Sequence, residues 1–208
     1  IVAGQPTRLV AVAPTLSEPG SDIVVRTRLE DVWGDPAAEP KTLIHSGFGD
    51  PGAYTISVTD EQTELQTETN PILVGVNDGY GRYWADLHGQ SEETIGTNSI
   101  DDYFRFGRDN AFLDACAHQG NDFQITDAFW DKIQQTTGEF NQPGKFVTFP
   151  GWEWSGNTGL GGDRNVLFRE EGGIISRSSR ALVAADEAAN PCSETVEELF
   201  DRLENCGR

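Results

Sequence analysis

The chain of 208 residues has no methionine, three histidines, three cysteines and few basic residues. Lysine and arginine number 15 against 34 aspartates and glutamates, which gives a net charge of -19. Because a phosphate backbone is bound by basic surface, we expect no nucleic-acid partner. Acidity of this kind is most often a solubility feature, so by itself it assigns no catalytic role.

Long apolar runs are also absent. No stretch approaches the roughly 18 to 20 apolar residues that a membrane helix requires, and no signal peptide is visible at the amino end. A start at Ile1 is typical of a processed or fragmentary chain. We expect a secreted or periplasmic protein, in which a Cys192–Cys206 disulfide would be plausible, although spacing alone proves no bond. Cys116 lies in an apolar run, where we expect a buried, inert thiol.

The sequence lacks the motifs of covalent nucleophiles and of nucleotide loops. There is no Gly-x-Ser-x-Gly elbow, so a serine nucleophile on a strand-to-helix turn is not expected. The glycine-rich stretch 156–162 lacks the Gly-Lys-Ser/Thr ending of a P-loop and does not directly open a helix. We interpret it as a flexible loop near an active site.

Residues 1–80 show short β-like runs separated by turn formers such as Asp50-Pro51-Gly52. This pattern predicts an antiparallel β-sandwich-like domain without chemistry of its own. His45 has no ligand-type neighbour, so we assign it no function. The predicted strands are Arg8 to Ala13, Ile23 to Leu29, Thr42 to His45, Tyr54 to Val58 and Ile72 to Val76.

From residue 81 to 208 strands alternate with helices, which predicts a largely parallel α/β domain. Ser99 followed by Asp102 resembles a capping box, and Thr126 is a second candidate helix cap. The predicted elements are a helix from Ser99 to about Phe112, a strand from Phe112 to Ala117, a helix from Thr126 to about Thr137, strands Lys145 to Phe149 and Arg164 to Arg169, and a helix from Thr195 to Asn205.

Polar residues follow the apolar runs of this second domain. Because ligands of parallel α/β proteins bind beyond the carboxyl ends of the strands, these residues should converge on one site. Asp86, His88 and Gln90 alternate, so on a regular strand all three would leave one face. The other candidates are His118, Asn121 and Asp122 after the second strand, Glu153 after the third, and Asp163-Arg164-Asn165 just before the fourth.

The order of these pieces resembles a family of bacterial proteins of unknown function that is related to the polymerase-and-histidinol-phosphatase (PHP) phosphoesterases. The resemblance covers roughly residues 82–182. It rests on Ala85-Asp86-Leu87-His88, Ile95-Gly96-Thr97-Asn98-Ser99, Phe112-Leu113-Asp114, His118-Gln119-Gly120-Asn121-Asp122, Gly151-Trp152-Glu153-Trp154-Ser155 and Gly162-Asp163-Arg164-Asn165-Val166-Leu167-Phe168.

The resemblance implies a distorted (β/α) barrel that holds two or three metal ions at its strand ends. In this chain only part of such a barrel would be present. Either a separate C-terminal portion completes it, or that portion was removed, or the barrel is incomplete. The implied metal ligands are His88, His118, Asp122 and Glu153, with Gln90 beside them. Zinc, manganese and iron are the ions that suit imidazole and carboxylate ligands together.

Each of these residues also has a structural interpretation. His88 would pack beside Trp84 and bind a carboxylate, and Asp122 would serve ordinary turn chemistry. Glu153, between two tryptophans, needs either a metal or an ion pair with Arg164. Arg164 would then bind either that carboxylate or an anionic substrate.

We therefore expect a metal-dependent hydrolase of phosphoesterase type that acts on a small anionic ester. Metal would activate water, Asp86 would assist from the first or second shell of ligands, and Arg164 would hold the substrate. The competing hypothesis is a catalytically degenerate module that binds a ligand or partner. It is supported by Gln90, Asn121 and Asp163, which stand where relatives carry histidine or an Asp-His pair.

Overall fold

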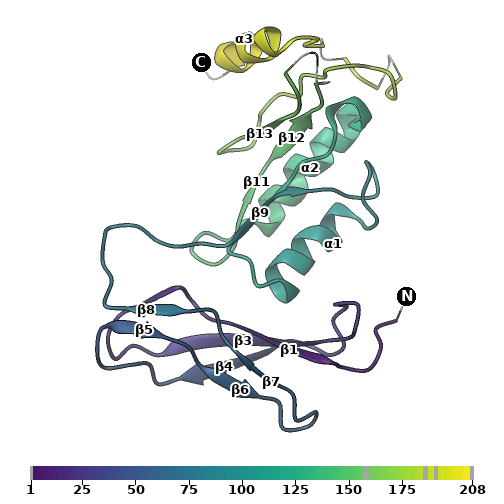
Figure 1. The fold of residues 1–208 in the computed structure, drawn as a ribbon. Helices are drawn as coiled ribbons and strands as arrows, with labels where there is room; N and C mark the ends of the chain where they lie inside the picture. The colour runs from purple at the N-terminus through teal and green to yellow at the C-terminus, as the bar shows by residue number, and fades with distance from the viewer. Residues whose placement is uncertain (1, 157–158, 160, 185–186, 190–191, 207–208) are drawn as a thin grey trace. The chain divides into compact units, whose positions relative to one another are not determined.

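The structure, a computed structural model, describes residues 2–156, 159, 161–184, 187–189 and 192–206, with Cys206 described by its backbone only. The chain divides into two compact units (Figure 1). The first comprises Ile1–Tyr83 with Asp109–Phe112, and the second comprises Trp84–Arg108 with Leu113–Arg208.

The first unit is built from short strands around one apolar core. β3 lies between β1 and β4, β8 lies between β2 and β5, and β6 pairs with β7. Four of the five strands expected from the sequence are confirmed within a few residues. The predicted strand Tyr54 to Val58 is wrong, because it spans the end of β5, a break at residues 55–56 and the start of β6, and these two strands belong to different sheets. The strands that the structure describes here are β1 (Arg8–Val12), β2 (Leu16–Ser17), β3 (Ile23–Glu30), β4 (Lys41–His45), β5 (Gly52–Tyr54), β6 (Ser57–Thr59), β7 (Gln66–Glu68) and β8 (Ile72–Val74).

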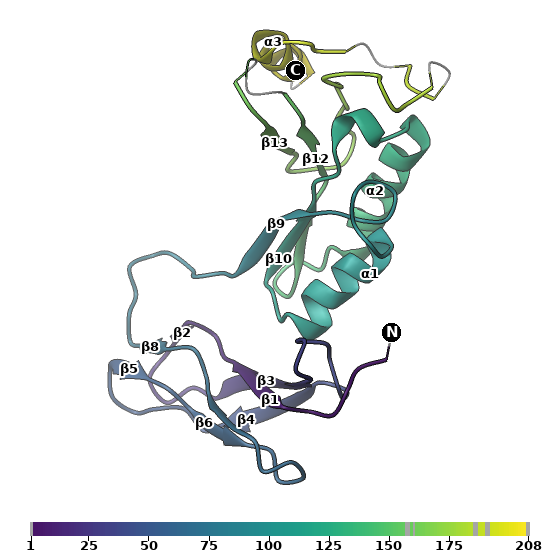
Figure 2. The ribbon, with the colours of Figure 1, turned by 45° about the vertical axis from the view of Figure 1, so that its right-hand side comes forward.

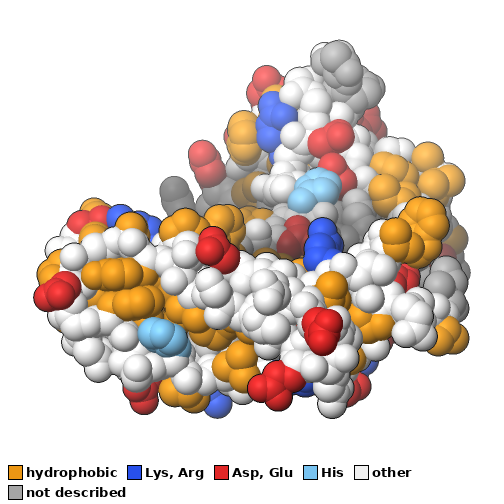
Figure 3. All heavy atoms as spheres, turned by 60° about the horizontal axis from the view of Figure 1, so that its bottom comes forward, with side chains coloured by type: hydrophobic (Ala, Val, Ile, Leu, Met, Phe, Trp, Pro, Cys, Tyr) orange, Lys and Arg blue, Asp and Glu red, His pale blue; other side chains and the backbone are white. Residues whose placement is uncertain are grey.

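The alternation of buried and exposed side chains along the strands explains the apolar core of this unit. Ile23 and Val25 of β3 are buried with Leu9, Ile72 and Val74, because successive side chains of a strand point to opposite faces. Val24, between the two buried residues of β3, is exposed. Figure 3 shows exposed hydrophobic side chains among polar ones on the face that it draws.

The second unit combines helices with a parallel sheet. The sheet has the order β11-β10-β9, and both pairings are parallel. Its described elements are β9 (Ala85–Gly89), α1 (Ile100–Arg105), the π-helix Phe106–Asn110 that runs into the first unit, β10 (Ala115–His118), the 3-10 helix Asp122–Gln124, α2 (Asp127–Phe140), β11 (Val147–Phe149), β12 (Gly151–Trp154), β13 (Arg164–Leu167) and α3 (Val196–Cys206).

Helices α1 and α2 lie together beside the parallel sheet (Figures 1 and 2). The Ser99 hydroxyl accepts a hydrogen bond from the backbone N of Asp102, and the Thr126 hydroxyl accepts one from that of Phe129, so both predicted caps are confirmed. α2 continues past Gly138 to Phe140. Ile100, Phe104, Phe129 and Ile133 form part of the core of this unit.

The predicted barrel is wrong, because the described residues contain small sheets and no barrel. Strand β13, expected to extend the parallel sheet, instead pairs antiparallel with β12, Gly151 opposite Leu167. A parallel neighbour requires a crossover connection, usually a helix. No described helix lies between β11 and β13, so the chain folds back as a hairpin.

Cys116 is buried and Cys192 partly buried, and both carry free thiols. The expected Cys192–Cys206 disulfide involves the side chain of Cys206, which lies outside the described residues. Within the part of the chain that the structure describes, no helix is long and apolar enough to cross a membrane.

Candidate functional site

A β-bulge in β9 separates Asp86 from His88. Asp86 pairs with Cys116, but Gly89, three residues on, pairs with His118, two residues beyond Cys116. The extra residue in β9 interrupts the regular alternation of side chains between Asp86 and Gly89. The expected common face is therefore broken. The Asp86 carboxylate accepts a hydrogen bond from the backbone N of His88 at 3.0 Å.

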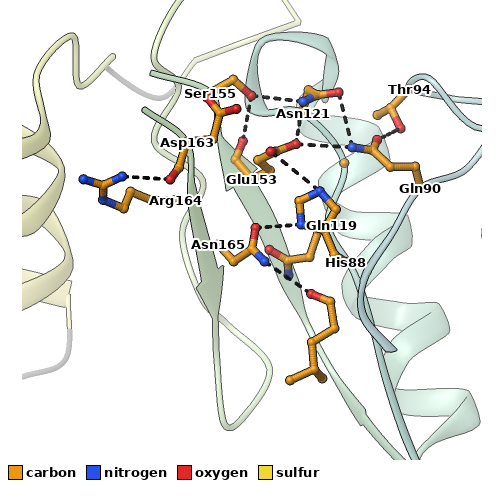
Figure 4. A network of polar contacts seen from close by, with 12 residues as sticks. His88, Gln90, Thr94, Gln119, Asn121, Glu153, Ser155, Asp163, Arg164 and Asn165 are labelled. Carbon is orange, nitrogen blue, oxygen red and sulfur yellow. Dashed lines mark hydrogen bonds and ion pairs between the residues drawn. The ribbon is translucent and has the colours of Figure 1, made fainter. Parts of the chain in front are cut away.

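The His88 ring faces the β12–β13 hairpin. Its Nδ1 lies 2.9 Å from Oδ1 of Asn165, and its Nε2 lies 3.7 Å from Oε1 of Glu153 (Figure 4). Asn165 and Glu153 are cross-strand partners, so the hairpin presents both groups to the ring together. The His88 side chain is 52% exposed and that of Glu153 8%, which makes His88 the accessible member of the pair.

Glu153 is a buried carboxylate between two fully buried tryptophans, Trp152 and Trp154. Burial raises the pKa of the Glu153 carboxyl above its usual range. The nearby His88 lowers this pKa, whereas Asp163 and Asp122 raise it further. The predicted ion pair with Arg164 is not among the contacts of the described residues, so this carboxylate has no strong cationic partner from them.

Two amide side chains hold the other oxygen of Glu153. Asn121 Nδ2 donates to Oε2 at 2.6 Å, and Gln90 Nε2 donates to the same oxygen at 3.3 Å. Thr94 in turn donates to Gln90 Oε1 at 2.5 Å, and Asn121 also donates to the Ser155 hydroxyl at 3.1 Å. These contacts fix Oε2, so Oε1 is the oxygen that faces His88 (Figure 4).

Asp122, expected as a metal ligand, is fully buried and holds loops together. Its carboxylate accepts hydrogen bonds from the backbone N and hydroxyl of Ser178 and from the backbone N of Ser155. Burial raises the pKa of Asp122, and these hydrogen bonds oppose the rise. With its oxygens occupied, Asp122 acts here as a structural anchor for residues 155 and 178.

His118, the other expected histidine ligand, is also fully buried. Its Nε2 lies 2.9 Å from the Ser91 hydroxyl, and its Nδ1 accepts a hydrogen bond from the backbone N of Gly120 at 3.3 Å. The ring packs edge-on against Phe129 of α2. Burial lowers the pKa of His118 to about 4, so the ring is neutral at physiological pH.

Arg164 lies apart from the cluster around Glu153. Its guanidinium donates to the backbone oxygens of Gly162 and Asp163, and Figure 4 shows it pointing away from His88. Arg164 pairs with Trp154 across the hairpin, one position from the Glu153–Asn165 pair, so it leaves the opposite face. The structure therefore does not bring this expected anion-binding residue to the cluster.

The structure brings together His88, Gln90, Asn121, Glu153 and Asn165. It adds Thr94, which the sequence did not single out, and Ser155, which stood in the quoted motif 151–155 without an expected role. Asn121 and Asn165 lay in the candidate strand-end tracts, but only the hairpin register reveals that Asn165 faces His88. Thr94 and Ser155 act through hydrogen bonds to amides, for which the sequence offers no signal.

The cluster can supply an imidazole nitrogen of His88 and a carboxylate oxygen of Glu153 to a cation. In the described part of the chain, no three His, Cys, Asp or Glu side chains converge as a metal-binding group. The two strong ligands present are therefore His88 and Glu153. The amide oxygens already face hydrogen-bond donors, so neutral donors such as water would complete the coordination of a cation there.

The fold and cluster define a two-unit α and β protein with an imidazole, carboxylate and amide site formed by β9, the segments that follow β9 and β10, and the β12–β13 hairpin. Residues 62–207 match the family described as protein of unknown function (DUF3604), and the chain belongs to this family. No solved structure is significantly similar to the chain.

Among curated proteins, an uncharacterized protein of Chlamydia pneumoniae is 29% identical over 126 residues, which cover 60% of this chain and 20% of the relative. Uncharacterized proteins of Chlamydia trachomatis and Chlamydia muridarum are each 27% identical over the same length. The match thus spans about a fifth of the length of these relatives.

Proposed function

We propose that this protein is a metal-dependent hydrolase in which His88 and Glu153 bind one divalent ion, zinc, manganese or iron. The observation that carries the proposal is the way the His88 ring meets Glu153. Asn165 Oδ1 is an acceptor, so the Nδ1 facing it carries the ring proton of a neutral imidazole. Nε2 then directs a lone pair towards a carboxylate oxygen 3.7 Å away.

Two electron-rich atoms that face each other are stabilised by a positive charge, which either a proton on Nε2 or a cation bound between the two atoms supplies. Metal-ligand distances of about 2.0 to 2.2 Å place two ligands of one zinc ion roughly 3.0 to 3.5 Å apart. The separation of 3.7 Å between Nε2 and Oε1 is close to this span and longer than a hydrogen bond. The pair is thus arranged as two ligands of one ion would be.

The neighbouring side chains support the same role. A metal-binding histidine commonly donates its other ring N–H to a fixed acceptor, as His88 does to Asn165. Gln90 and Asn121 donate to Oε2 of Glu153 and so hold this carboxylate in place. When bound, the ion would polarise an ester and lower the pKa of a water molecule. The phosphoester class of substrate rests on the sequence resemblance to PHP proteins.

A second candidate is a module that binds a ligand without turnover. It is favoured by the amides at Gln90, Asn121 and Asn165, which are weaker ligands than histidine or carboxylate. Chelation distinguishes the two, because turnover that stops with a chelator supports the enzyme. Ligand binding that survives chelation supports the module.

The first test measures metal content and zinc or manganese affinity of the purified protein and of His88→Ala and Glu153→Gln. We expect either substitution to lower affinity at least about 100-fold, more than the roughly tenfold to 100-fold typical of outer partners. His45→Ala is the matched control, because His45 lies in the first unit and binds the backbone N of Gly47.

Phosphate and sulfate esters are then screened with the metal-loaded protein. Hydrolysis that is lost in His88→Ala and retained in His45→Ala is the expected result. A protein that binds no divalent metal, or a His88→Ala variant with unchanged hydrolysis, would overturn the proposal.

A further inference from the structure

We infer that Asn165 is a positioning residue that fixes the tautomer of His88 and thereby directs its Nε2 lone pair at Glu153. The inference deepens the proposed function and rests on it for its purpose. Its geometric content, the tautomer of His88, is measurable without any metal.

Asn165 has a defined orientation. Its Nδ2 donates to the backbone oxygen of Leu87 at 3.5 Å, which leaves Oδ1 to face the His88 ring at 2.9 Å. A carbonyl oxygen only accepts, so the ring nitrogen opposite it must be the donor. Asn165 therefore selects the Nδ1–H form of neutral His88. Nε2, the nitrogen nearer Glu153, is left without a proton.

Hydrogen bonds to the backbone of the hairpin and of the parallel sheet hold Asn165 beside the His88 ring. The buried Gln119 donates from Nε2 to the oxygens of His118 and Val166, which ties β13 to the end of β10. The backbone N of Glu153 also donates to the oxygen of Gly120. The hairpin is thus fastened to the parallel sheet on both of its strands, next to the residues that meet His88.

The other two histidines have the opposite tautomer. Nδ1 of His118 accepts from the backbone N of Gly120, and Nδ1 of His45 accepts from that of Gly47 at 3.0 Å. Both rings must then carry the neutral-state proton on Nε2. With three histidines in the chain, His88 should be the single Nδ1–H ring.

The test is nuclear magnetic resonance of the metal-free full chain with isotope-labelled imidazole nitrogens, at neutral to mildly alkaline pH. Long-range proton–nitrogen correlations should show two Nε2–H rings and one Nδ1–H ring. The signals of the Nδ1–H ring should be missing from the spectrum of His88→Ala, which assigns them to His88. In Asn165→Leu the His88 ring should lose its Nδ1–H preference. Asn165→Asp, which keeps an acceptor, should retain it, and Leu167→Ala on the same strand is the control.

Zinc titration of the same variants links the tautomer to the site. Asn165→Leu should lower zinc affinity roughly tenfold to 100-fold, and Asn165→Asp should restore most of it. An Nε2–H ring at His88 in the unaltered protein, or an unchanged Nδ1–H ring in Asn165→Leu, would overturn the inference. If the expected tautomers are found but neither the unaltered protein nor any variant binds zinc, the proposed function is overturned. The assignment of Asn165 as the residue that sets the tautomer is then still supported.

Discussion

The titratable residues of the second unit differ in their burial and therefore in their roles. His118 and Asp122 are fully buried, and their polar atoms are occupied by Ser91, Gly120, Ser155 and Ser178. His88 is half exposed and faces a carboxylate instead. A ligand can therefore reach His88 without breaking the contacts that stabilise the fold.

The buried His118 should make stability depend on pH. Its folded pKa of about 4 lies below the unfolded value of about 6.5, so its contribution is present above that value and is lost as pH falls towards 4. The expected loss is about 3 kcal/mol. Urea unfolding followed by tryptophan fluorescence measures it, since Trp130, Trp152 and Trp154 are buried in this unit.

The comparison variant is His118→Gln, whose amide can donate to Ser91 but does not titrate in this range. Although its stability at neutral pH will be lower, its decline between about pH 7 and about pH 4 should be smaller than that of the unaltered protein. An equal decline in both proteins would show that His118 does not carry this pH dependence.

At the scale of elements, the β12–β13 hairpin decides what the site contains. β12 supplies Glu153 and β13 supplies Asn165, and their register makes the two residues partners. The hairpin approaches the end of β10 closely at Gly151, where a Cβ atom would lie 2.1 Å from Nε2 of Gln119 and 2.5 Å from the oxygen of Val166. A glycine is therefore required at this position for steric reasons.

Gly151→Ala should consequently destabilise the second unit by about 1 to 3 kcal/mol, the usual cost of overpacking. It should also weaken the Nδ1–H preference of His88, because Asn165 moves with β13. Gly49→Ala is the control, since an added Cβ there meets nothing within 4 Å. Equal unfolding midpoints for the two variants would contradict the close approach at Gly151.

Element positions were largely predictable because their signals are local. The caps at Ser99 and Thr126 indicated α1 and α2. The helical spacing of the apolar residues Val196, Leu199, Phe200 and Leu203 indicated α3, in which Phe200 is exposed. The direction of β13 relative to its neighbouring strand was not predictable in this way. Whether a strand returns parallel or antiparallel depends on its connection, and the sequence between Trp154 and Arg164 resembles a loop without specifying its path.

At the scale of the whole molecule, the net charge of -19 implies self-repulsion in the compact state. Raising salt from about 0.01 M to about 0.15 M shortens the Debye length from about 30 Å to about 8 Å. The urea midpoint should therefore rise with sodium chloride. Choline chloride should give the same rise, because screening does not depend on the cation, and a flat or falling midpoint would contradict the prediction.

The sequence by itself determined most of the longer strands of the first unit, the helices of the second, and the tracts of polar residues from which the site is drawn. Tertiary structure decided which of those residues meet. The register shift in β9 breaks the alternation that would place Asp86 and His88 on one face. His118 and Asp122 are buried and bound to other residues, and the β12–β13 hairpin brings Asn165 to His88. Caps and periodicity act within a few residues, whereas register, hairpin direction and desolvation depend on residues distant in the chain.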